Sequence, residues 1–184
     1  MLTAREGWAV ARPGSIRQMK ELLQGRRLGF ALRPAFGQVA FGLGLAAVLV
    51  DLAAWFAWGT RETNAFVWAA YWLFGGVAIL GLLAVLCSLA ELRDVPGDER
   101  SLARIDLAVL ALAAVAATIS MALRSGELGA AGASPAPLLI GILSLVAVGA
   151  ALVTGGDLYA AREWELIDEV HAREPHSRKG AHAR

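Results

Sequence analysis

The sequence predicts an all-α fold, an integral membrane bundle of four transmembrane helices with an N-terminal amphipathic interfacial helix. Three observations predict it. Four long apolar segments each reach the ~18 to 20 residues that a helix needs to span a bilayer. Of the 184 residues, 57% are hydrophobic and 18% are charged, which is more apolar than a usual soluble domain. Of the 17 Lys and Arg residues, 15 lie in the two terminal segments and the 91–104 connection, which four spans place on one side of a membrane.

The four apolar segments divide the chain. They run at about Val39–Gly59, Ala65–Leu89, Ile105–Leu123 and Leu138–Tyr159. A short connection joins the first two segments, so we expect them to form an antiparallel helical hairpin. The predicted domains are a cytoplasmic basic segment with the amphipathic helix at 1–38, a transmembrane domain at 39–160, and a cytoplasmic helical extension with a disordered tail at 161–184.

The basic residues orient the bundle in the membrane. Residues 1–38 carry seven, the 91–104 connection carries three and the C-terminal tail carries five. The other two connections carry only Arg61 and Arg124. Because cytoplasmic loops carry the excess of Lys and Arg in membrane proteins, we expect both termini to be cytoplasmic.

Residues 15–25 form the predicted amphipathic helix. Ser15 is a suitable N-cap, with Gln18 in the capping-box position three residues later. Apolar residues recur on one face at helical spacing, at Ile16, Met19, Leu22 and Leu23. A helix of this kind beside a membrane span lies among the lipid headgroups. The alternative is a solvated tail that is helical for part of the time.

Four of the six tryptophans lie beside the connection 60–64, at Trp55, Trp58, Trp68 and Trp72. Tryptophan favours the membrane interface because its ring is apolar while its N–H needs a polar partner. The pattern therefore indicates an interfacial aromatic belt on the outer side. A platform for a quinone or a pigment is the alternative, which the sequence does not require.

Asp51 is the leading candidate for a functional residue. An ionisable side chain inside a span costs about 2.5–3.5 kcal/mol, so Asp51 should face the bundle interior and find a partner there. It is a proton or cation site, or a buried group that joins helices. The second interpretation is favoured, because a transport path usually shows several polar groups inside the membrane and these spans show one. The expected partners are Thr118, Ser120, Tyr71 and Trp72.

Three more carboxylates fall near the cytoplasmic ends of the spans, at Glu91, Asp106 and Asp157. If the spans form one bundle, these groups approach each other near Arg93 and Arg104. The cluster is then a cation site or a collar of salt bridges. The collar is favoured, because helix ends at a membrane interface commonly carry charges.

The rest of the sequence offers no catalytic chemistry. All three histidines lie in the C-terminal tail, so no pair of axial histidines for a haem lies within the spans. The single cysteine, Cys87, excludes an internal disulfide framework and a cysteine-rich metal site. The spans contain no nucleophile with a base and no phosphate loop. We therefore expect a protein that is not an enzyme, with no cofactor, no metal and no nucleic-acid partner.

Small residues inside the spans predict close contacts between helices. Examples are Gly42 with Ala46, Ala53 with Ala57, Gly75 with Gly76, and Gly149 with Ala151. These residues favour a structural or accessory subunit that lies in the lipid bilayer and associates with other membrane proteins or with itself as a homo-oligomer. The alternative is a small transporter or an ion- or proton-conducting protein that uses Asp51.

The stretch 33–51 resembles the opening of a bacterial family of four-helix membrane proteins, the "domain of unknown function 2231" group. Pro34 and Asp51 fit the family pattern, and so does the Gly155–Leu158 close of the last span. The family histidines are absent, since Arg33 and Gln38 stand at their positions. The resemblance implies a four-helix architecture in a bacterial inner (cytoplasmic) membrane, and it implies no activity.

Overall fold

The structure is a computed structural model that describes residues 13–24, 31–56, 58, 64–97 and 99–173, with side chains from residue 18 to residue 157. Its described part is all helical, as expected, and contains no strand. The five helices are α1 (Pro13–Leu23), α2 (Leu32–Trp55), α3 (Ala65–Glu91), α4 (Arg100–Ser125) and α5 (Pro135–Arg173).

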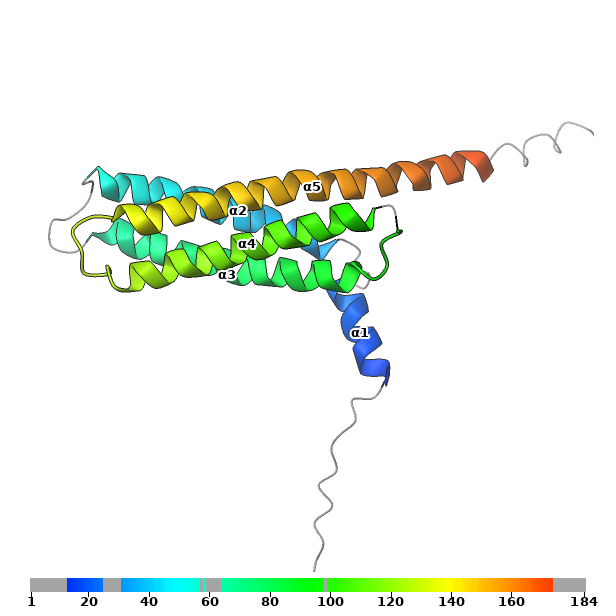
Figure 1. The fold of residues 1–184 in the computed structure, drawn as a ribbon, viewed down its shortest axis with the longest axis horizontal. Coiled ribbons are helices and arrows are strands. Elements are labelled where there is room, and N and C mark those ends of the chain that lie inside the picture. The colour runs from blue at the N-terminus through cyan, green and yellow to red at the C-terminus, as the bar shows by residue number, and fades with distance from the viewer. Residues whose placement is uncertain (1–12, 25–30, 57, 59–63, 98, 174–184) are drawn as a thin grey trace, which may run out of the picture.

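Helices α2 to α5 form an antiparallel bundle (Figure 1). Each helix packs against the next one along the chain, and α5 also packs against α2. Helices α2 and α4 therefore lie diagonally across the bundle and run in the same direction. We call the end where α2 begins and α3 ends the α1 end, and the end where α2 finishes and α3 begins the opposite end.

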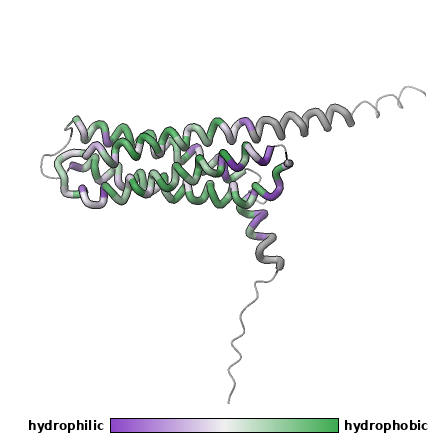
Figure 2. The backbone as a smooth tube through the Cα atoms, in the orientation of Figure 1, coloured by the Kyte–Doolittle hydropathy of each residue, from purple (hydrophilic) through white to green (hydrophobic). Residues whose placement is uncertain are grey.

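All four bundle helices are long and apolar enough to cross a membrane, over Leu32–Trp55, Ala65–Glu91, Arg100–Ser125 and Pro135–Asp157. Figure 2 shows hydrophobic residues along the whole bundle, with hydrophilic residues gathered mainly at the α1 end. This is the architecture of a multi-pass membrane protein. Helices α2 and α4 begin earlier than expected, because each takes in charged residues that hydropathy alone places outside a span.

Small residues allow the bundle helices to approach closely. The Phe74 ring of α3 packs so tightly against Gly141 of α5 that a Cβ at Gly141 would lie 2.5 Å from the ring. Gly81 of α3 packs against Ala114 of α4 in the same way, since a Cβ at Gly81 would lie 3.2 Å from the alanine Cβ. Gly42, in contrast, is exposed, and Ala57 lies outside the described residues. The expected close contacts are found at Gly75, Gly76, Gly149 and Ala151.

Helix α1 meets the bundle through its polar side. Lys20 forms a salt bridge with Asp94, with 2.7 Å between Nζ and Oδ1. Gln24 donates to Oδ2 of Asp94 at 2.6 Å and to the carbonyl of Ala90 at 3.3 Å. The apolar Met19 stays 62% exposed. This exposure fits the predicted placement of α1 at a membrane surface. Residue 25, the predicted end of this helix, lies outside the described residues.

Helix α5 is much longer than a membrane span. Its backbone continues past Asp157, where the apolar portion ends, as far as Arg173. At about 1.5 Å of rise per residue, this continuation carries the helix about 24 Å beyond the bundle (Figure 1). The backbone of α5 is therefore helical over residues 158–173, and the residues after 173, where the disordered tail is predicted, lie outside the described residues.

Candidate functional site: two buried ion pairs across the bundle

Asp51 of α2 forms an ion pair with Arg124 of α4 at the opposite end of the bundle. Both side chains are 1% exposed. The guanidinium meets the carboxylate twice, through Nη2 to Oδ2 and through Nε to Oδ1, the latter at 3.3 Å. This two-pronged geometry is typical of strong arginine–carboxylate pairs, and it joins two helices that lie diagonally across the bundle.

The remaining surroundings of Arg124 are also polar or aromatic. Its Nη1 donates to the carbonyl of Ser120 at 3.0 Å and also contacts the Ser120 hydroxyl. Its Nη2 donates to the carbonyl of Pro137 in α5 at 3.1 Å. The guanidinium carbon lies 4.3 Å from the centroid of the Phe74 ring of α3, which is a cation–π arrangement. Arg124 therefore touches all three other helices of the bundle.

A second ion pair lies at the α1 end, between Arg33 of α2 and Asp106 of α4. Their side chains are 7% and 3% exposed. Nε of Arg33 donates to the Ser88 hydroxyl of α3 at 2.8 Å. The Thr154 hydroxyl of α5 donates to Oδ1 of Asp106 at 2.9 Å. All four helices of the bundle thus contribute to this cluster as well.

The two ion pairs have a reciprocal arrangement. Arg33 and Asp51 are as far apart along α2 as Asp106 and Arg124 are along α4, with the charges in the opposite order. Each separation is about five turns of an α-helix, so the two charges of a helix face the same side of it. The separation corresponds to about 27 Å of helix, close to the thickness of a bilayer hydrocarbon core.

The layer between the two ion pairs is apolar. Its core contains buried small and branched side chains from all four helices: Ala47, Val48, Val77, Ala113, Ala117, Ala147 and Val148. The Ser144 hydroxyl is the polar group buried among them, and it donates to the carbonyl of Ala113 at 2.9 Å. The buried charges of the described spans are therefore separated by packed hydrocarbon.

These findings correct the sequence interpretation of Asp51. Asp51 does face the interior, but its partner is Arg124, and Ser120 contacts Arg124 instead of the carboxylate. The expectation of one ionisable group within the spans is wrong, since four buried charges lie there. Charge counting places Arg33 and Arg124 in the flanking connections. Helical phase was the missed signal, because a whole number of turns separates the two charges of each helix.

The predicted carboxylate cluster is also different in the structure. Asp106 is buried and pairs with Arg33, while Arg93 and Arg104 are exposed. Asp157 is exposed as well. Among the described residues, no three carboxylate, histidine or cysteine side chains gather as a metal site would require. Of the favoured collar of salt bridges, the described residues show the Arg33–Asp106 pair, whose arginine comes from α2.

The four tryptophans of the predicted aromatic belt are all exposed. Trp55 and Trp68 are 48% and 44% exposed, and Trp58 and Trp72 are 66% and 64% exposed. They lie at the opposite end of the bundle, beside the ends of α2 and α3. Exposed tryptophans at the end of a span are the arrangement that an interfacial belt requires.

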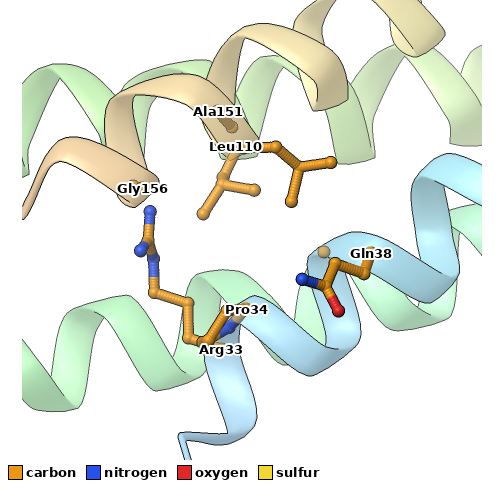
Figure 3. A pocket seen from close by; sticks show the side chains of 9 residues that line it. Arg33, Pro34, Gln38, Leu110, Ala151 and Gly156 are labelled. Atoms are coloured by element: carbon orange, nitrogen blue, oxygen red, sulfur yellow. The ribbon is translucent and has the colours of Figure 1, made fainter. Parts of the chain in front are cut away.

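A pocket of about 240 Å³ lies beside the Arg33–Asp106 pair, between α2 and α5 (Figure 3). Its lining combines the Arg33 side chain with Pro34, Gln38, Leu110 and small residues of α5. No sequence pattern predicts this pocket, because it forms only where α2 and α5, which are distant in the sequence, lie side by side.

No family model, no curated protein and no solved structure matches the chain. The resemblance to the "domain of unknown function 2231" group thus stays a prediction.

Proposed function

We propose that this multi-pass membrane protein is a non-enzymatic structural or accessory subunit that associates with other membrane proteins. The observation that carries the proposal is the internal pairing of charge. Each buried charged side chain of the described spans, Arg33, Asp51, Asp106 or Arg124, has its counter-ion on another helix of the same chain. Their hydrogen bonds connect all four helices, as expected of groups that stabilise the bundle.

A conducting role for Asp51 is less well supported. A transported proton or cation needs polar groups in succession along the bundle. Here the two ion pairs stand about 27 Å apart along their helices, with packed aliphatic side chains between them. The Asp51 carboxylate already pairs with the guanidinium of Arg124. A transported cation would have to displace this guanidinium before it could bind Asp51.

The α5 extension supplies a surface for partners. It continues from Asp157 to Arg173 and stands clear of the bundle (Figure 1). A helix that projects from its own bundle is available to a neighbouring protein. Apart from Arg33, Arg61 and Arg124, every Lys and Arg belongs to the N-terminal segment, the 91–104 connection or the chain after Asp157. The proposed orientation therefore places this extension in the cytoplasm.

The proposal is tested by gentle detergent extraction of the full chain from its native membrane, followed by mass spectrometry of the proteins that elute with it. The test variant is Glu165→Pro, because proline inside a helix costs about 3 kcal/mol or more and breaks the extension. The control is Glu165→Ala, which removes the same charge and keeps the helix.

We expect a stoichiometric membrane-protein partner with the wild type and with Glu165→Ala, and its loss with Glu165→Pro. The bundle should unfold at the same temperature in all three proteins. A chain that elutes alone from the native membrane would contradict the accessory role.

A further inference from the structure

The pocket beside Arg33 lies near the ends of two membrane-spanning helices. Arg33 is the second residue of the α2 span, and Gly155 and Gly156 immediately precede Asp157, the last residue of the α5 span. The pocket therefore lies at the boundary between the hydrocarbon core and the lipid headgroups. Its lining residues come from α2 and α5, with Leu110 of α4 behind them (Figure 3).

One charged side chain, the cationic member of the Arg33–Asp106 pair, lines the pocket. Among the described residues that line it, Arg33 alone is charged, and its side chain is 7% exposed. Asp106, the counter-ion of Arg33, does not line the pocket. A ligand in the pocket thus meets the cationic side of this ion pair. Gln38, exposed further along α2, adds a carboxamide.

Glycine residues of α5 form one wall of the pocket. At Gly155 a Cβ would lie 2.7 Å from both terminal nitrogens of Arg33, so glycine is what permits the guanidinium to reach α5. At Gly156 a Cβ would meet nothing within 4 Å. A side chain introduced at Gly156 therefore begins in open space at the wall of the pocket.

The volume of the pocket fits the headgroup of a lipid and is too small for the whole lipid molecule. The pocket measures about 240 Å³, whereas pockets that enclose drug-sized ligands measure roughly 300–1,000 Å³. A phosphate with part of its glycerol is of the right size. The remaining lining, which includes Leu110, Ala151 and Leu152, is apolar. Acyl chains would continue along the exposed surfaces of α2 and α5.

From this charge, depth and size we infer that the pocket binds the phosphate headgroup of an anionic phospholipid of the surrounding bilayer, with Arg33 as its cationic partner. Basic pockets between membrane helices are known to hold anionic headgroups. The site goes beyond the accessory role proposed above, and neither depends on the other.

The test measures lipid binding to the detergent-solubilised full chain by native mass spectrometry. The probes are phosphatidylglycerol, phosphatidylcholine and soluble glycerol phosphate. Gly156→Leu fills the pocket, and Gln38→Glu places a negative charge in its lining. The matched control is Gly42→Leu, since Gly42 is exposed on α2, outside the pocket, and its Cβ would also meet nothing within 4 Å.

We expect phosphatidylglycerol to bind at least about tenfold more tightly than phosphatidylcholine, a difference of about 1.4 kcal/mol. Gly156→Leu and Gln38→Glu should each remove most of this preference, and Gly42→Leu should keep it. Equal binding of the two lipids would overturn the inference. So would an unchanged preference in both pocket variants, or glycerol phosphate binding as tightly as the lipid, which would indicate a soluble anion.

Discussion

Removal of one member of the Asp51–Arg124 pair should destabilise the bundle far more than removal of both. In Asp51→Leu, the guanidinium of Arg124 stays buried with only the Ser120 and Pro137 groups as acceptors. An uncompensated buried charge of this kind costs about 3–5 kcal/mol. Arg124→Leu leaves the Asp51 carboxylate buried without its counter-ion, so this variant should cost a similar amount.

The double variant Asp51→Leu/Arg124→Leu should recover most of this loss. Replacement of a whole buried ion pair by apolar residues is often neutral or stabilising, and the hydroxyl of Ser120 keeps its 2.7 Å hydrogen bond to the carbonyl of Pro137. The double-mutant cycle should therefore give a coupling energy of at least about 3 kcal/mol.

The assay is reversible unfolding by SDS in mixed micelles, followed by circular dichroism. The control cycle uses Lys20→Ala and Asp94→Ala, whose salt bridge is 37% and 41% exposed. Exposed pairs of this kind contribute about 0.2–1 kcal/mol. Single variants of Asp51 and Arg124 that cost no more than this control would refute the reasoning. A double variant that costs the sum of the single ones would refute it as well.

The packing, the connections and the charge distribution each carry a further prediction. Gly141→Leu should lower the free energy of unfolding by about 1–3 kcal/mol, because the new side chain would collide with the Phe74 ring. Gly129→Leu is the control, since a Cβ at Gly129 would meet nothing within 4 Å, and it should change the free energy of unfolding little in the same assay. Asn64→Ala should cost about 1–3 kcal/mol, because the carboxamide caps α3 and donates to two loop carbonyls; an unchanged unfolding midpoint would show that these bonds are not needed. Reporter fusions should place Gly129 outside and Arg184 in the cytoplasm, and an external C-terminus would reverse the proposed topology.

The helices themselves could be predicted from hydropathy, because a run of about 20 apolar residues has few other stable arrangements. The extension of α5 followed from its polar but helix-compatible sequence. The first residues of α2 and α4 could not be predicted in this way, because Arg33 in α2 and Arg100 and Arg104 in α4 lower the local hydropathy although they belong to the helices.

The candidate site was predictable in part. The burial of Asp51 followed from the cost of an ionisable group in lipid. Its partner did not follow, because positive-inside counting treats Arg124 as a loop residue. The equal spacing of the charges in α2 and in α4 indicates that each helix carries its two charges on a single face. That these two faces meet is known only from the order in which the helices pack around the bundle. The spacing of residues along the sequence does not predict this order.

Flux measurement in liposomes tests the central claim most directly, namely that the buried charges hold the bundle together and carry no ions. Wild type, Asp51→Asn and Asp51→Leu/Arg124→Leu would be reconstituted, and proton and cation entry would be followed under a membrane potential. We expect no flux above that of empty liposomes for any of the three proteins. Flux through the wild type that disappears in Asp51→Asn would contradict the claim and would make Asp51 a transport residue.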